Sequence, residues 1–160
     1  MTLLLAILLA APPGYAKEIA EAVEDTRSVW SVPSMLVAAI IKQESGFNPQ
    51  AVSAVGAVGL RQIMPFNASK LGIKARDLVN PRLNILAGVR LLAVLLKHYD
   101  GDVITALVAY NSGPKPIGKV PSNGETPAYV VRILRFWRDY ELQLQDAGDF
   151  QIVHQTRRPR

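Results

Sequence analysis

Apolar residues recur along most of the chain at helical spacing, three and four positions apart. This period predicts a first helix over residues 17–30, with acids on its other side, and a second helix that begins at Pro33. A long helix is expected over residues 81–99 and a last one over 126–144. Strand-like alternation is almost absent, so the predicted fold class is mostly α, as a single globular domain.

Shorter elements are expected between these helices. Residues 59–64 form a predicted short helix that Pro65 stops, and a second short helix is expected over 67–71. Asp102 is a good N-cap for a helix that runs through Tyr110. Residues 48–57 and the Gly- and Pro-rich residues 111–123 are expected to be loops. Past Gln145 the chain is expected to form an irregular, basic C-terminal tail, residues 145–160.

One carboxylate lies where the helical pattern predicts an apolar side chain. Leu36, Ile40 and Glu44 are spaced four residues apart, so Glu44 extends the buried stripe of the second helix. It also falls in the last helical turn, where the helix dipole disfavours negative charge. Both effects would raise the pKa of Glu44, as a general acid requires at neutral pH. The alternative is an ordinary surface glutamate on a frayed helix end.

The beginning of the chain resembles an export signal. Residues 1–11 are apolar and too short to span a bilayer, and small residues at Gly14 and Ala16 fit a cleavage site. We therefore predict a signal peptide over 1–16, a catalytic domain over 17–144, and a periplasmic or exported protein. No Lys or Arg precedes the apolar run, so an uncleaved membrane anchor or a start codon assigned too late would explain it equally well.

Composition excludes several classes of site and partner. The chain has 160 residues, a formal charge of +5, no cysteine and two histidines. Without cysteine, disulfides and a lipoprotein anchor are excluded, and a structural zinc site is not expected. The positive charge would suit nucleic acid, an anionic membrane or an acidic polymer, but no nucleic-acid-binding motif is present. An anionic wall polymer agrees best with the export signal, and no cofactor or metal is expected.

Three segments, in order, resemble one known family. They are ESGFNPQAVSAVGAVGLRQIMP over residues 44–65, AYNSGP over 109–114, and Glu125-Thr126 followed by Tyr129-Val130. Together they resemble the soluble lytic transglycosylases, which are related in fold to goose-type lysozyme and cleave the glycan strands of bacterial peptidoglycan. The resemblance spans residues 29–134. It implies a lysozyme-like fold of the α+β superfamily, here with little or no strand.

The resemblance also implies a mechanism with one catalytic residue. Glu44 would protonate the oxygen between N-acetylmuramic acid and N-acetylglucosamine, and would then take the proton of the C6 hydroxyl, which attacks to leave a 1,6-anhydro end. Between residues 27 and 124 the other acids are Asp77, Asp100 and Asp102, which fit turn or capping positions. No second catalytic carboxylate is evident, and in this family the substrate's acetamido group takes that role.

Six residues match family positions that line the site or bind substrate: Ser53, Gln62, Met64, Tyr110, Asn111 and Tyr129. Each has a structural alternative. Gln62 would otherwise be a solvated helix amide, and Ser53 a loop-turn serine. Met64, Tyr110 and Tyr129 would otherwise belong to the core, and the main role of Asn111 is to shape its loop. Glu125 matches a position that supports the site by ordering the nearby loop through hydrogen bonds.

Arg61 is a departure from the family pattern, which usually has methionine there. A cation at this position would contact an acidic peptide stem or lie along the surface. Two other functions compete with transglycosylation: a lysozyme-like hydrolase that delivers water, and a non-catalytic peptidoglycan-binding module. The expected partner is the peptidoglycan glycan strand, with the protein a monomer. Its small size would suit local wall opening for a conjugation, secretion or phage apparatus.

Overall fold

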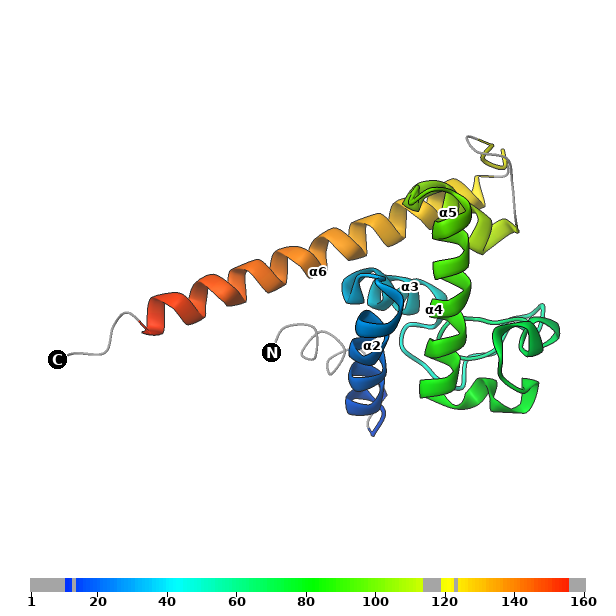
Figure 1. Cartoon of the computed structure of the whole chain (residues 1–160), viewed down its shortest axis with the longest axis horizontal. Helices are drawn as coiled ribbons and strands as arrows, with labels where there is room; N and C mark the ends of the chain where they lie inside the picture. Colours follow the sequence, from blue (N-terminus) through cyan, green and yellow to red (C-terminus); the bar gives the residue numbers. More distant parts are fainter. Residues whose placement is uncertain (1–10, 13, 114–118, 123, 156–160) are drawn as a thin grey trace.

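The computed structural model describes residues 11–12, 14–113, 119–122 and 124–155. Its α-helices are α2 (Ala16–Trp30), α3 (Ser34–Ser45), α4 (Pro81–His98), α5 (Val103–Ser112) and α6 (Glu125–Gln155). In Figure 1 α2 and α4 stand side by side, and α6 crosses beside α3 and α5. The fold is mostly helical, as predicted, and no named strand occurs in the described residues.

The helix α3 is buried on all sides at the centre of the molecule. Every residue from Ser34 to Ile41 is buried, because α2 and α6 both pack against this helix. Only its last turn, from Lys42 to Ser45, is partly exposed. Gly46 then ends the helix in a left-handed conformation (φ 58°), and its N–H donates to the Lys42 carbonyl over 3.1 Å. The helix therefore delivers its final turn, and with it Glu44, to the edge of the core.

The predicted starts of two helices are confirmed by their caps. The Asn80 side chain accepts from the N–H of Leu83 before α4, and Pro81 occupies the first helical position. Asp102 caps α5 as predicted, accepting from the N–H groups of Ile104 and Thr105. These caps fix where α4 and α5 begin, and so which of their residues face the core.

The short helix predicted over residues 59–64 is wrong. Gly59 (φ 80°) and Gln62 (φ 48°) both have left-handed backbone, which ends any helix at once. Val58 instead exchanges two backbone hydrogen bonds with Ile63, each 3.0 Å long, and forms a second isolated bridge with Val52. The segment is thus a folded-back loop, and we call residues 51–64 the active-site loop.

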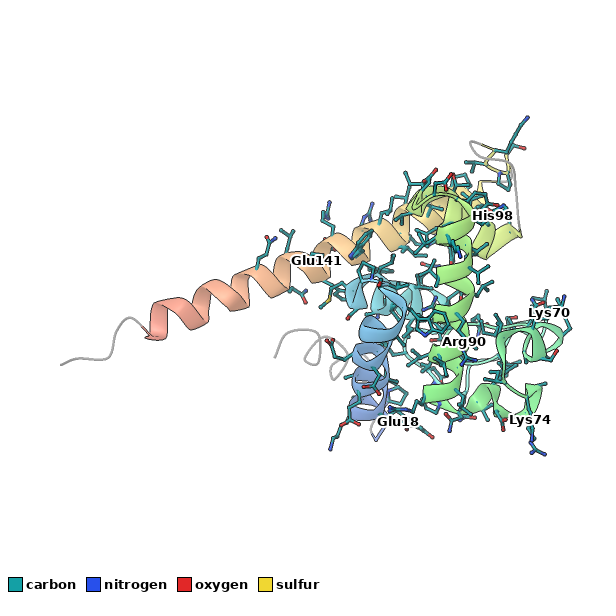
Figure 2. The ribbon with its side chains drawn as sticks, in the orientation of Figure 1. Glu18, Lys70, Lys74, Arg90, His98 and Glu141 are labelled. Carbon is teal, nitrogen blue, oxygen red and sulfur yellow. The ribbon has the colours of Figure 1, made fainter. Side chains whose placement is uncertain are left out.

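A small lobe of 3-10 turns follows this loop. It contains η1 (Pro65–Asn67), η2 (Ser69–Leu71) and η3 (Ala75–Val79), so the helix predicted over 67–71 is only a 3-10 turn over 69–71. Its own apolar cluster is Ile63, Ala68, Ile73, Leu78 and Ala87. Lys70 and Lys74 are exposed at its outer edge, and Arg90 of α4 ties the lobe down by donating to the Leu71 carbonyl over 2.7 Å (Figure 2).

The last helix is longer than predicted. The helix α6 continues to Gln155, so the expectation of an irregular segment from residue 145 is wrong for residues 145–155. No proline interrupts this stretch, and Gly148 alone costs a helix only about 1 kcal/mol. Figure 1 shows its C-terminal part extending away from the other helices. The end of the predicted tail, and most of the predicted signal peptide, lie outside the described residues.

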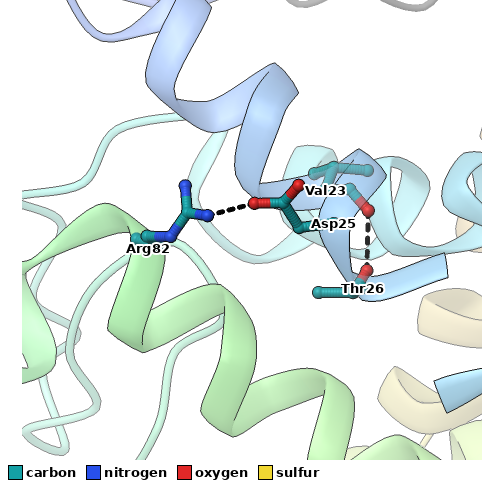
Figure 3. A network of polar contacts seen from close by, with 4 residues as sticks. All are labelled: Val23, Asp25, Thr26 and Arg82. Atoms are coloured by element: carbon teal, nitrogen blue, oxygen red, sulfur yellow. Dashed lines mark hydrogen bonds and ion pairs between the residues drawn. The ribbon is translucent and has the colours of Figure 1, made fainter. Parts of the chain in front are cut away.

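An ion pair joins the two helices that stand side by side, and a further polar contact lies within α2. Arg82 of α4 pairs with Asp25 of α2, and the Thr26 hydroxyl donates to the Val23 carbonyl one turn earlier over 2.7 Å (Figure 3). Both charged side chains of the pair are more than half exposed, so the pair adds little stability. In the part of the chain described here, every helix is too short or too polar to cross a membrane.

Candidate active site

Glu44 meets a tyrosine that lies far away in the sequence. The hydroxyl of Tyr129, on the first turns of α6, donates to Glu44 Oε1 over 2.6 Å. Tyr129 is only 3% exposed, whereas Glu44 is partly exposed in the last turn of α3. This short, charge-assisted bond fixes one carboxylate oxygen and leaves the other for a different partner.

Burial raises the pKa of Glu44 above its ordinary value of 4.5. The bond from Tyr129 and the positive charge of Arg61 act in the opposite direction, and burial is the largest of the three causes. Glu44 therefore keeps its proton to a higher pH than a surface glutamate would. The position predicted from the helical pattern is confirmed, and the alternative of an ordinary surface glutamate does not fit this burial.

The expectation that Arg61 contacts solvent or substrate at the surface is wrong. Arg61 is completely buried, with its Nη2 group donating to the Gly88 carbonyl over 3.2 Å. Its Nε donates to the hydroxyl of Tyr110, also over 3.2 Å, and the guanidinium carbon lies 5.2 Å from the centre of that ring. The backbone of the active-site loop turns the side chain inward, and the missing side chain of Gly88 leaves room for it.

Tyr110 lies on α5, and its hydroxyl makes two hydrogen bonds with Arg61. The hydroxyl accepts from Arg61 Nε and donates to the Arg61 carbonyl over 3.1 Å. Burial is the main reason that the pKa of Tyr110 is raised, with a further increase from the charge of Glu44. The structure therefore brings Tyr110 close to Glu44, while its hydroxyl is already bonded to the active-site loop.

Two predicted substrate-binding residues hold the active-site loop in shape. The Gln62 amide nitrogen donates to the carbonyls of Ala51 and Gly59, over 3.2 and 2.9 Å. The Ser53 hydroxyl oxygen accepts from the N–H of Ala57 over 3.0 Å. No hydrogen bond joins Ser53 to Glu44 in the described part of the chain. Both residues are partly exposed, so each keeps a polar atom for another contact.

Asn84 and Ser45 anchor this loop, and the sequence reasoning did not identify either. Asn84 is fully buried on α4; its oxygen accepts from the N–H of Arg61 over 2.7 Å, and its nitrogen donates to the carbonyls of Val58 and Leu78. Ser45 donates to the Leu60 carbonyl over 3.0 Å, beside Glu44. The sequence does contain one indication of this role, because Asn84 is a polar residue on an otherwise apolar stripe of α4.

Of the remaining predicted residues, Asn111 and Glu125 lie where α5 ends and α6 begins. Thr126 donates to the Asn111 side chain over 2.8 Å and so joins the end of α5 to the start of α6. Glu125 is exposed in the first turn of α6, and the hydrogen bond that joins the loop to α6 is made by its neighbour Thr126. Met64 is partly exposed at the end of the active-site loop. Within the described residues no group of three or more His, Asp or Glu side chains could hold a metal ion.

Comparisons with known proteins agree with this geometry. The family model described as "Transglycosylase SLT domain" matches residues 21–129. A protein of Enterobacteria phage PRD1 named "Transglycosylase" is 43% identical over 84 residues, which is 52% of this chain and 31% of that protein. The "Peptidoglycan transglycosylase gp16" of Escherichia phage T7 is 32% identical over 110 residues, 66% of this chain and 8% of that one.

A solved structure has the same fold. The 70 kDa soluble lytic transglycosylase of Escherichia coli superposes with a TM-score of 0.70 and 26% sequence identity, over 78% of this chain and 24% of that protein. The chain thus spans less than a third of the length of these relatives. The part of the chain that the family model matches includes Glu44, the active-site loop and Tyr129.

Proposed function

Because the chain belongs to the SLT transglycosylase family, we propose that it is a peptidoglycan lytic transglycosylase. It cleaves the β-1,4 bond between N-acetylmuramic acid and N-acetylglucosamine and leaves 1,6-anhydro-N-acetylmuramic ends. The observation that carries this proposal is the single carboxylate Glu44, held at the edge of the core, bonded by Tyr129 and with a raised pKa.

In the first step Glu44 acts as the acid. Its proton passes to the glycosidic oxygen, the bond from that oxygen to the anomeric carbon breaks, and N-acetylglucosamine leaves. The acetamido oxygen of the muramic acid closes on the anomeric carbon and takes the place of a second carboxylate. Burial supports this step, because it keeps Glu44 protonated at a pH where surface glutamates are ionised.

In the second step the same residue acts as the base. The Glu44 carboxylate takes the proton of the C6 hydroxyl, whose oxygen attacks the anomeric carbon and releases the acetamido oxygen. The attacking hydroxyl belongs to the same sugar, so it has the proximity advantage of an intramolecular nucleophile. The Tyr129 hydroxyl supports the carboxylate between the two steps by donating to one of its oxygens.

The predicted binding residues have separate roles in this proposal. The partly exposed Gln62, Met64 and Ser53 lie on the active-site loop beside the end of α3 and contact the glycan. Asn111 and Glu125 shape the entrance, at the junction of α5 and α6. Tyr110 acts by holding the active-site loop, and Tyr129 acts by holding Glu44.

The test is the chemical form of the product. Purified peptidoglycan is digested with the wild-type protein and with the Glu44→Gln variant, and the released muropeptides are weighed by mass spectrometry. A 1,6-anhydro end is lighter than a reducing end by one water. Mostly anhydro ends, absent with the variant, are expected. Mostly reducing ends would mean a lysozyme-like hydrolase, and no release with retained binding to the wall would mean a binding module.

The biological role we propose is local opening of the cell wall, by a periplasmic or exported monomer, for a phage, conjugation or secretion apparatus. Its support is that two of the relatives are phage proteins named as transglycosylases. Deleting the gene and scoring DNA transfer, secretion or phage release against ordinary growth would test this role. A defect in wall recycling alone would contradict it.

A further inference from the structure

The buried side chain of Arg61 is a cation without an anionic partner at contact distance. No ion pair of Arg61 occurs among the residues that the structure describes, and its Nη1 atom is buried without a hydrogen-bond partner. Taking a guanidinium out of water costs several kcal/mol unless other interactions compensate. An arginine in this position therefore calls for an explanation beyond filling space, which an apolar side chain would do at lower cost.

The surrounding structure holds this charge in one place. The backbone N–H of Arg61 is fixed by Asn84, and the guanidinium by the carbonyl of Gly88 and the hydroxyl of Tyr110. A Cβ atom at Gly88 would lie 2.7 Å from the Cβ and Cγ atoms of Arg61, closer than any real contact. The glycine thus lets the arginine pack directly against the backbone of α4, with its side chain immobilised.

Groups from three different elements lie near Glu44. Tyr129 of α6 donates a hydrogen bond to it, and Tyr110 of α5 is close enough for the charge of Glu44 to raise its pKa. The positive charge of Arg61 acts from the active-site loop, where the Ser45 hydroxyl, next to Glu44, donates to the carbonyl of Leu60, next to Arg61, over 3.0 Å. On α3 itself, Lys42 is directed to the Phe47 ring, with 6.0 Å from its Nζ to the ring centre. Arg61 is the group whose positive charge favours the ionised form of Glu44, which burial disfavours.

We propose that Arg61 is a positioning residue for the transglycosylation step: its fixed, buried charge stabilises the Glu44 carboxylate after proton donation, and its guanidinium holds the Tyr110 hydroxyl in place. This inference rests on the proposed function. It explains why the site tolerates a buried cation. The carboxylate must exist for as long as the intermediate lasts, and a preorganised charge stabilises it without rearrangement of solvent.

Arginine is the side chain that suits this role. A guanidinium stays charged when buried, whereas a lysine ammonium loses its proton more readily. The guanidinium also offers donors in different directions, one to Tyr110 and one to Gly88. The proton balance is unchanged: Glu44 gives one proton to the leaving oxygen and regains one from the C6 hydroxyl, while Arg61 gives none.

The test measures the titration of Glu44 directly. The protein is labelled with ¹³C at the glutamate carboxyl carbons, and the Glu44 signal is assigned by its loss in Glu44→Gln. Arg61→Met, which introduces the residue usual at this position, is expected to raise the pKa of Glu44 by about 1 unit, the lower end of the effect of a nearby opposite charge. Arg61→Lys is expected to restore part of the difference.

Kinetics supply the second reading. In Arg61→Met the alkaline limb of the kcat/KM profile is expected to move to higher pH, while kcat falls, since the carboxylate is no longer stabilised. The matched control is Arg90→Met, which removes a partly buried arginine that contacts Leu71 and the Trp30 ring. It is expected to leave the Glu44 titration unchanged.

Two results would overturn the proposal. A folded Arg61→Met with the wild-type titration of Glu44 would show that Arg61 only fills space, and so would the same shift in Arg90→Met. If Arg61→Met does not fold, Arg61→Gln, which keeps polar contacts without the charge, gives the same comparison. The titration needs no substrate, so it tests the coupling even if the wild-type protein releases no muropeptides, an outcome that would contradict the proposed function alone.

Discussion

The hydroxyl of Tyr129 is the contact whose removal bears most directly on Glu44. Tyr129→Phe deletes one oxygen and keeps the ring, which is 3% exposed and packed in the main core. The deleted hydroxyl donates to Glu44 Oε1 over 2.6 Å, and it favours the carboxylate over the neutral acid. The change therefore acts on Glu44 with little disturbance of the packing around it.

The size of the effect follows from the type of bond. A hydrogen bond to a charged group contributes about 1.5–3 kcal/mol, and one pKa unit corresponds to about 1.36 kcal/mol. The variant is therefore expected to raise the pKa of Glu44 by about 1–2 units. Because the carboxylate is the base in the second step, kcat is expected to fall about 10–100-fold. The alkaline limb of the rate profile is expected to move to higher pH, since Glu44 stays protonated longer.

Two assays read this out separately. Carboxyl NMR gives the titration of Glu44, and muropeptide release over a range of pH gives kcat and kcat/KM. The control is Tyr140→Phe, a partly buried tyrosine further along α6 whose pKa burial and the neighbouring Asp139 raise to about 12. It is expected to change neither reading. Wild-type titration and kcat in Tyr129→Phe would refute the view that this bond supports the carboxylate.

Two further predictions concern stability as well as activity. Glu44→Gln is expected to lower turnover by at least about 100-fold and to leave the protein more stable than wild type at pH 7. The folded state binds the Glu44 proton more tightly than the unfolded state, so wild-type stability is lost as pH rises through the raised pKa. Thermal unfolding should show that the difference in stability between the variant and the wild type disappears below about pH 4. A difference that is constant with pH would contradict this account. Asn84→Ala removes three hydrogen bonds, two of them buried and one partly buried, so urea unfolding should show a loss of about 2–4 kcal/mol. A loss under about 1 kcal/mol would mean that Asn84 does not anchor the loop.

Local pattern was sufficient to predict the helices and the place of the acid. The apolar period located α2, α3 and α4, and Asp102 marked the start of α5. Glu44 could be placed at the end of a buried stripe because helical spacing fixes which residues share a face. Its burial and its raised pKa followed from that position.

Tertiary contacts decided what the pattern could not predict. Residues 59–64 resemble a helix locally, but Val58 pairs with Ile63 and the loop folds back. Arg61 was expected at the surface because charged residues are seldom buried, and its inward turn depends on Asn84 and Gly88 from α4. The end of α6 was misplaced because polar residues without a proline carry no clear stop signal.

The bond between Glu44 and Tyr129 joins residues 85 positions apart, which has a consequence for the order of folding. Contacts this distant in sequence require closure of a long loop, so they form only when most of the chain is available. Until α6 docks on α3, Glu44 is an ordinary solvated carboxylate with neither the burial nor the partner that its chemistry needs. A nascent or truncated chain that has not yet acquired α6 is therefore expected to lack the proposed activity, so the site is completed only by the last helix to be synthesised.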